Sequence, residues 1–234
     1  RPMWYALNDT KPNYEYSFNY QNWYPSVEQE CKNTVQNVGL YELTPFSKYE
    51  IKGKKAYEEL QRLCTANIKN EVGKCTYTQM LNEGGGIETD LTVVCIDKNH
   101  FRIISSAAVR THDKAHILKH LSKDVEFKDV TDDLICLGIF GPKSRDLLSQ
   151  ITNESLSNEN FKFGTSKNIK LGLMNVWVQR LSYVGELGYE LYVNNSDGIE
   201  LYNLILNTGK DFGISHCGTH TMDIMRMESG FLHW

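Results

Sequence analysis

The sequence of 234 residues lacks an apolar run long enough to cross a bilayer, for which a helix needs roughly 18 consecutive apolar residues. The N-terminus, RPMWYALND, also lacks the basic-then-apolar pattern of a signal peptide. C-x-x-C pairs are missing too. The six cysteines lie far apart in the sequence, at Cys31, Cys64, Cys75, Cys95, Cys136 and Cys217. In a chain of this length such usage is typical of a reducing compartment, so we expect a cytoplasmic protein with no membrane attachment.

An excess of basic residues is also missing. The chain carries 25 Lys and Arg against 29 Asp and Glu, a net charge of −4, and has no basic stripe with interleaved aromatic residues. This argues against nucleic acid as a partner. His112, His116 and His120 recur on one face of a predicted helix, but H-E-x-x-H and an acidic third ligand are absent from the sequence. We therefore predict a solvated helix face there and no metal site.

Two pairs of segments resemble each other along the chain. YEIKGKKAYEELQRL (49–63) matches LGIFGPKSRDLLSQI (137–151) at an offset of 88 residues, and both predict a strand, a glycine turn and a short helix. YTQMLNEGGGIETDLTV (77–93) matches WVQRLSYVGELGYELYV (177–193) at an offset of 100 residues, and both predict a β-hairpin. A helix is predicted after each hairpin, over 112–121 and over 198–206.

This repetition predicts an α+β fold. We expect two pseudo-repeated strand–helix–hairpin–helix units with mostly antiparallel sheets around a central cleft. The predicted division is an N-terminal arm over 1–36, a first repeat over 37–131 and a second repeat over 132–234. Because the chain begins without Met and stops directly after a helix-like segment, we expect a piece of a longer polypeptide.

The hairpin match places Asp90 on Glu190. Equivalent positions of a pseudo-two-fold pair approach each other near the axis, so we expect both acids to face the shared cleft. For Asp90, the alternation of side chains along the strand is compatible with a position facing the cleft and also with a position exposed to water. Two such carboxylates could be the acid and base of a glycosidase, or one could bind the N–H edge of a fused heterocycle while the other takes a proton. Three tyrosines could supply ring faces and hydroxyl groups, namely Tyr77, Tyr183 and Tyr189.

The motifs GGIETDLTV, SYVGELGYELYV and TMDIMRMESGFLHW resemble the folate-binding aminomethyltransferase family of the glycine-cleavage T protein. With EYSFNYQNWYPSVEQEC and GLYELTPFSKYEIKG, the whole chain is most similar to the C-terminal folate domain of dimethylglycine and sarcosine dehydrogenases. The resemblance implies that Asp90 assists proton removal from a tetrahydrofolate nitrogen and that Glu190 holds the amine edge of the pterin. It also implies that Tyr77 and Tyr183 line the pocket. The glycines over 84–86 would then only turn the chain so that Asp90 reaches the cleft.

The chain departs from that family at two points. T proteins carry A-R-D where this sequence has Thr221-Met222-Asp223, so one basic contact to folate is missing. This favours the dehydrogenase branch. The third domain of the family, a small β-barrel, would begin beyond Trp234. Arg226 could contact the folate tail or pair with a neighbouring acid.

The function that the resemblance implies is tetrahydrofolate-dependent one-carbon transfer. The donor would be a methylated amine such as dimethylglycine or sarcosine, or an aminomethyl group. Flavin is expected only from a separate domain or subunit, because no dinucleotide-binding fingerprint precedes this region. Two alternatives stay open: a folate-dependent demethylase of a sulfonium or amine, and a folate-binding scaffold without transfer chemistry.

Overall fold

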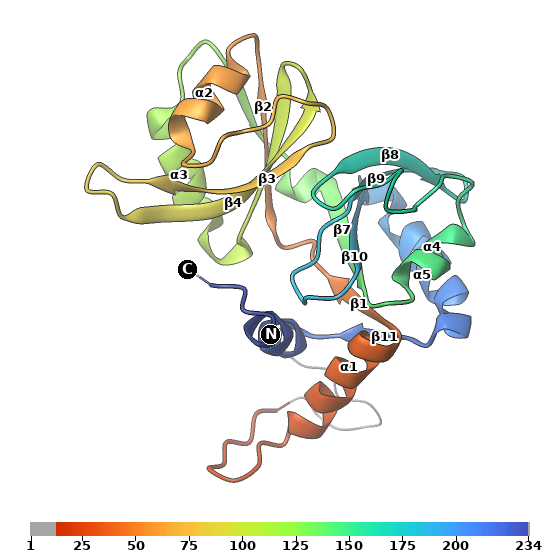
Figure 1. The fold of residues 1–234 in the computed structure, drawn as a ribbon. Helices are drawn as coiled ribbons and strands as arrows, with labels where there is room; N and C mark the ends of the chain where they lie inside the picture. The colour runs from red at the N-terminus through yellow and green to blue at the C-terminus, as the bar shows by residue number, and fades with distance from the viewer. Residues whose placement is uncertain (1–12, 234) are drawn as a thin grey trace.

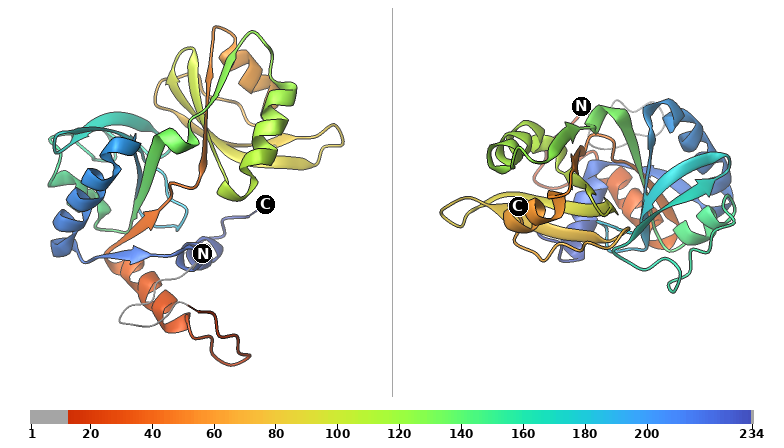
Figure 2. Two further views of the ribbon diagram at one scale, coloured as in Figure 1. Left: turned by 180° about the vertical axis from the view of Figure 1, so that it is seen from behind. Right: turned by 90° about the horizontal axis from the view of Figure 1, so that it is seen from above.

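The computed structural model describes residues 13–233, so the first twelve residues of the predicted arm and Trp234 lie outside the described residues. Two β-sheets lie next to each other, and each packs two helices against one of its faces (Figure 1). The views from behind and from above show the same division into two halves (Figure 2). Within residues 13–233, none of the helices has the length and apolar character that crossing a membrane requires.

The first sheet, which we call sheet 1, holds most of the N-terminal half. Its strands, in spatial order, are β3 (Cys75–Leu81), β4 (Ile87–Asp97), β5 (His100–Ser105), β2 (Ser47–Lys52) and β6 (Glu126–Asp129). All neighbours are antiparallel. Helices α2 (Ala56–Leu63) and α3 (Arg110–His120) close one face, where Leu60 and Ile117 pack on Tyr49, Ile51 and Phe101.

Sheet 2 holds most of the C-terminal half. Its strands, in spatial order, are β11 (Ile214–Cys217), β1 (Val38–Glu42), β7 (Leu134–Phe140), β10 (Gly188–Asn194), β9 (Met174–Gln179) and β8 (Ser166–Leu171). All neighbours are antiparallel except β1 and β11. Helices α4 (Ser144–Ser149) and α5 (Gly198–Gly209) cover one face. Two largely antiparallel sheets with helices confirm the predicted α+β class.

Two further helices lie below the sheets in Figure 1. Helix α1 (Tyr24–Gln36) carries a proline in its first turn and packs on α6 (Thr219–Glu228) and on β11. Pro is favoured there because the first helical N–H groups have no partner within the helix. Met225 of α6 joins a third apolar cluster between the sheets. Short 3₁₀ helices span Ala107–Val109, Thr131–Asp133, Asn195–Asp197 and Lys210–Phe212.

The order of elements is the same in both halves. Sheet 1 contains the sequence β2–α2–β3–β4–β5–α3, and sheet 2 contains β7–α4–β8–β9–β10–α5. In each sheet the three-stranded meander ends beside the first strand, giving the spatial orders β3-β4-β5-β2 and β8-β9-β10-β7. The predicted repetition and its offset of 88 residues are therefore confirmed, but each unit has a three-stranded meander where the sequence predicts a two-stranded hairpin.

The offset of 100 residues is wrong as an equivalence between hairpins. Asp90 lies on β4, the second strand of its meander, whereas Glu190 lies on β10, the third strand. The register gives the correct counterpart, because Glu50 lies opposite Arg102 and Gly138 lies opposite Glu190. Both pairs fall at the offset of 88 residues, so Arg102 is the counterpart of Glu190.

The domain boundaries at residues 36 and 131 stay a prediction. Residues 24–36 of the predicted arm form α1, and β1 of the predicted first repeat lies in sheet 2. The chain thus crosses between the halves immediately after β1. It crosses back after β6, through the segment Asp129–Asp133.

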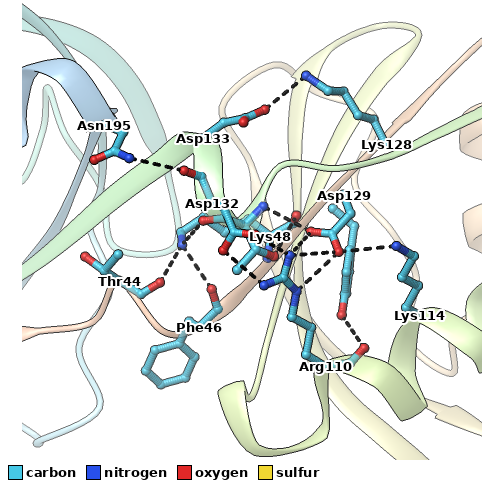
Figure 3. A network of polar contacts seen from close by, with 12 residues as sticks. Thr44, Phe46, Lys48, Arg110, Lys114, Lys128, Asp129, Asp132, Asp133 and Asn195 are labelled. Atoms are coloured by element: carbon cyan, nitrogen blue, oxygen red, sulfur yellow. Dashed lines mark hydrogen bonds and ion pairs between the residues drawn. The ribbon is translucent and has the colours of Figure 1, made fainter.

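A polar network holds that second crossing (Figure 3). Lys48 is fully buried, and its Nζ donates to the carbonyl oxygens of Thr44 at 2.8 Å, Phe46 at 3.0 Å and Thr131 at 3.3 Å. Burial lowers the pKa of Lys48. Arg110 of α3 donates to the carboxylates of Asp129, the last residue of β6, and of Asp132, within the 3₁₀ helix that follows. The network therefore fixes the linker between the sheets.

The edges of the two sheets meet at β3 and β8. The N–H of Cys75 donates to the carbonyl of Gly164 at 2.9 Å, and the N–H of Ser166 donates to the carbonyl of Gly73 at 2.6 Å. Gly73 has φ = +85°, and a Cβ there would lie 2.4 Å from the carbonyl oxygen of Ser166. Only glycine fits this contact. Strand β3 is consequently attached to both halves of the molecule.

Candidate functional site

Asp90 is placed by strand alternation on the half-buried face of β4. Thr89, Leu91 and Val93 are buried in the core of sheet 1, while Asp90 lies on the other face and is partly exposed. The hydroxyl of Tyr77 on β3 donates to Oδ2 of Asp90 at 2.8 Å. The side chain of Tyr77 is 59% exposed, so this pair lies open to an incoming ligand.

The glycine turn before Asp90 is built around one asparagine. The side-chain Oδ1 of Asn82 accepts from the N–H groups of Gly84 at 3.0 Å and Gly86 at 2.9 Å. Gly85 adopts φ = +82°, a conformation that side-chain-bearing residues rarely take. The turn closes on its own residues, and Asp90 follows in the strand directly opposite Gln79.

Tyr183 and Arg226 approach the same region from the β9–β10 loop and from α6. The ring of Tyr183 stacks on Phe231, with centroids 6.0 Å apart. Burial raises the pKa of Tyr183, the charge of Arg226 lowers it, and the charges of Asp90 and Asp223 raise it. Arg226 itself is held by Asp223, with Nε 2.7 Å from Oδ1. The structure thus brings Asp90, Tyr183 and Arg226 within electrostatic reach, and Arg226 pairs with a neighbouring acid.

Glu190 lies on the face of β10 that points to the interior between the sheets. Its Oε2 accepts from the hydroxyl of Tyr192 at 2.8 Å. Burial raises the pKa of Glu190 from 4.5 to about 7, and the hydrogen bond from Tyr192 opposes this shift. Near neutral pH this carboxyl is therefore divided between its charged and neutral forms.

Strand β3 connects the two acids. Cys75 lies two residues before Tyr77, so both side chains point to the same face. Burial raises the pKa of Cys75 to about 12, and the charge of Glu190 raises it as well. The carboxylate of Glu190 is therefore close enough to act on the Cys75 thiol, and Tyr77, which donates to Asp90, lies two residues further along the same face of β3. Burial, the hydrogen bond and the charge of Asp90 likewise raise the pKa of Tyr77 to about 12.

Tyr189 does not join this group, so its predicted role as a ring face is wrong. It is fully buried in the core of sheet 2, and its hydroxyl accepts from Nε of Arg145 at 3.2 Å. The cause is strand alternation, which turns adjacent residues of β10 to opposite faces. Glu190 and Tyr189 consequently point away from each other.

Two hollows in the described residues lie elsewhere. One, of about 570 Å³, is lined by Glu42, Arg110, Asp132 and Asn195 with their neighbours. The other, of about 680 Å³, lies between α5 and the β8–β9 turn. Neither is lined by a residue predicted for the folate site. Within residues 13–233, no group of three His, Cys, Asp or Glu side chains is arranged to hold a metal ion.

Gln179 and Phe231 also belong to this region, and neither is among the residues predicted from the sequence. Gln179 lies directly opposite Glu190 and is fully buried. Its match with Gln79 in the hairpin comparison was a signal for it, since both glutamines lie opposite an acid. Phe231 follows α6 with no local pattern that marks it. Its stacking on Tyr183 depends on how the C-terminal segment returns toward the first half (Figure 2).

Comparison with known proteins identifies the family. A family model described as the GCVT N-terminal domain matches residues 1–234. The chain belongs to the GCVT N-terminal domain family. This match confirms the resemblance to the glycine-cleavage T protein.

Two curated relatives and one solved structure show the range of this family. Human mitochondrial dimethylglycine dehydrogenase is 36% identical over 237 residues, which cover 100% of this chain and 27% of that protein. The 4-methylaminobutanoate oxidase (formaldehyde-forming) of Paenarthrobacter nicotinovorans is 34% identical over 100% of this chain and 28% of that protein. This GCVT-family chain therefore spans just over a quarter of these relatives.

The crystal structure of aminomethyltransferase T of the glycine cleavage system from Bartonella henselae has the same fold. The two superpose with a TM-score of 0.79 at 19% identity, covering 94% of this chain and 60% of that one. The likeness supports the two-sheet GCVT architecture and extends to the fold alone.

Proposed function

We propose that this GCVT-family chain binds tetrahydrofolate and assists the transfer of a one-carbon unit to it from a methylated amine. The observation that carries the proposal is the Tyr77–Asp90 pair, an accessible carboxylate held by a 2.8 Å hydrogen bond within electrostatic reach of Tyr183. Two relatives are named for methylated amino acids, dimethylglycine and 4-methylaminobutanoate. This supports a methylated amine as the donor.

Glu190 fits the pterin end of the ligand. Tetrahydrofolate presents an N–H and an adjacent amino group on one edge of its ring, and a carboxylate accepts both. The single hydrogen bond to Glu190 that the described residues provide comes from Tyr192 and occupies Oε2. The charged form, which burial disfavours in the free protein, would gain two donors on binding. Tyr183 would then lie against the ring or its substituent.

Asp90 would act as a base. As a folate nitrogen forms its bond to the incoming carbon, the bond from that carbon to the donor nitrogen breaks and the donor amine leaves with the electron pair. The folate nitrogen loses a proton, which the carboxylate of Asp90 would accept. The hydrogen bond from Tyr77 would hold the carboxylate in position during this step. A positioned base contributes roughly 10²–10⁴-fold, and holding the reactants together contributes further. Tetrahydrofolate supplies the nucleophilic nitrogen when it is bound.

The identity of the donor determines whether the reaction also needs an oxidation step. An aminomethyl group already carries carbon at the required oxidation level, whereas dimethylglycine or sarcosine must first lose two electrons. We propose that a flavin domain or subunit outside this chain takes those electrons. We also propose a cytoplasmic location, since all six cysteines are free. Cell fractionation tests this location. Because one relative is named as a mitochondrial protein, recovery of this protein in the mitochondrial fraction is the competing result.

Turnover and titration of Asp90→Asn test the proposal. We expect the variant to bind tetrahydrofolate with unchanged affinity in a calorimetric titration while losing most one-carbon transfer. Asp97→Asn is the matched control, because Asp97 lies exposed at the end of the same strand. Unchanged turnover in Asp90→Asn would remove the assigned role. Binding without any transfer, in a protein supplied with an aminomethyl donor, would indicate the scaffold alternative instead.

A further inference from the structure

Gln179 has a buried side chain that nothing satisfies. It is 0% exposed, and neither its Oε1 nor its Nε2 has a hydrogen-bond partner within the described residues. Buried polar atoms are almost always paired, and an unpaired one costs roughly 1–3 kcal/mol. A glutamine with both ends unpaired therefore costs the free protein stability.

The position of Gln179 relates it to Glu190. On β9 it lies directly opposite Glu190 of β10 and opposite Ser166 of β8. Directly opposite residues of antiparallel strands project to the same face, with Cβ atoms about 4.5–5.5 Å apart. The two side chains therefore lie side by side on the face of sheet 2 that points to the interior.

A second unpaired donor lies on the same face. Trp177 precedes Gln179 by two residues, and its indole Nε1 is also buried without a partner among the described residues. Its cross-strand neighbour is Tyr192, the residue that donates to Glu190. The interior face of β9 and β10 thus carries a carboxylate with one partner, an amide with none and an indole N–H with none.

We propose that Gln179 is a binding residue for the ring of the ligand that Glu190 holds. This rests on the proposed function and extends it. A carboxylate can only accept, so it selects the edge of the ring that carries N–H groups. The amide of Gln179 offers both a donor and an acceptor, and it suits the neighbouring edge, where a reduced pterin places carbonyl or ring-nitrogen acceptors beside an N–H. Together the two side chains select a ring with alternating donors and acceptors.

The competing account is a structural water. A buried water bridging Oε1 and Nε2 to backbone groups would also satisfy Gln179. The two accounts differ in what happens when the amide is removed. A water-bridged glutamine stabilises the free protein, whereas a binding glutamine with no partner does not, because replacing unpaired polar atoms by apolar ones is neutral or stabilising.

Gln179→Met tests the proposal, since methionine keeps the length and the unbranched shape of the side chain. We expect the free variant to unfold in urea at the same concentration as the wild type or at a higher one. We expect its affinity for tetrahydrofolate, measured by calorimetry, to fall roughly tenfold or more. Gln150→Met, at an exposed position, is the matched control. Gln179→Leu serves as a second variant if the first does not fold.

One ligand fragment locates the contact. Tetrahydropterin, the ring alone, should lose affinity for Gln179→Met by the same factor as tetrahydrofolate does. Equal binding of tetrahydrofolate to wild type and variant would overturn the inference, and so would a loss of stability with unchanged binding. Failure of the wild type to bind tetrahydrofolate at all would instead refute the proposed function, so the two failures are distinguishable.

Discussion

Replacing Glu190 by Gln should make the free protein more resistant to rising pH. Burial raises the pKa of Glu190 from 4.5 to about 7, so between these values the folded state binds more protons than the unfolded state does. The stability that the neutral carboxyl provides is fully present below pH 4.5 and is lost as pH rises through 7. At 1.36 kcal/mol per pH unit, the total loss is at most about 3 kcal/mol.

The Glu190→Gln variant removes the pH-dependent contribution of this carboxyl to stability and changes little else. A glutamine at position 190 can still accept the hydrogen bond from Tyr192, and it does not titrate. The other groups near this site, the thiols of Cys75 and Cys136 and the hydroxyl of Tyr192, have pKa values that burial raises further above neutrality. They stay neutral across the interval. The difference between wild type and variant therefore isolates the carboxyl of Glu190.

Urea denaturation from pH 4.5 to pH 8 measures the effect. We expect the free energy of unfolding of the wild type to fall with pH, relative to Glu190→Gln, by up to about 3 kcal/mol. In the same variant, tetrahydrofolate binding should weaken by roughly 1.5–3 kcal/mol, the scale of a charged hydrogen bond. Parallel pH profiles would refute the raised pKa of Glu190, and equal affinity would refute its role in binding. Glu200→Gln, on the exposed face of α5, is the control.

Three further substitutions test other parts of the structure. Tyr77→Phe should change the free energy of unfolding by less than about 0.5 kcal/mol, because the side chain is 59% exposed, yet lower kcat through loss of the bond to Asp90; equal kcat would contradict this. Lys48→Met should destabilise by about 2 kcal/mol or more in urea, since three backbone carbonyls lose their donor; wild-type stability would show that the network of Figure 3 contributes nothing. Gly73→Ala should destabilise by about 2 kcal/mol or more, because its φ of +85° and the Ser166 carbonyl leave no room for a Cβ; an unchanged melting temperature would refute this.

The local sequence pattern was sufficient to predict the orientation of side chains wherever one face of a helix or strand is buried. The alternation in Ile87–Asp97 assigns Asp90 to the face opposite Leu91 and Val93, and the structure has the same assignment. The strand–glycine–helix units were also predictable, since each combines a period-two pattern with a period-3.6 pattern across a glycine turn. The family resemblance then named residues that the structure brings into one region, including Tyr77 and Tyr183.

A three-stranded meander contains two hairpins, and the local sequence pattern could not show which of the two a given segment forms. The two compared hairpins look alike because each has a glutamine opposite an acid, Gln79 with Asp90 and Gln179 with Glu190. That similarity comes from cross-strand pairing, which is the same in any antiparallel hairpin. The true equivalence depends on the position of β5 between β4 and β2, which is a long-range pairing. The acids therefore come from non-equivalent positions, and no pseudo-symmetry brings them together.

The attachment of β3 to both sheets fixes the sheet that carries one acid against the sheet that carries the other. Sheet 1 supplies Asp90, sheet 2 supplies Glu190, and the contacts of Cys75 and Gly73 with β8 fix one sheet against the other. The large apolar core beneath sheet 2 keeps β9 and β10 in place, so it can hold Glu190 and Gln179 in surroundings that disfavour them. Under the proposed function, a ligand that supplies the missing hydrogen bonds would relieve their unfavourable burial. That relief would add to affinity, and it would favour a ring whose donors and acceptors match both side chains over one that matches only the carboxylate.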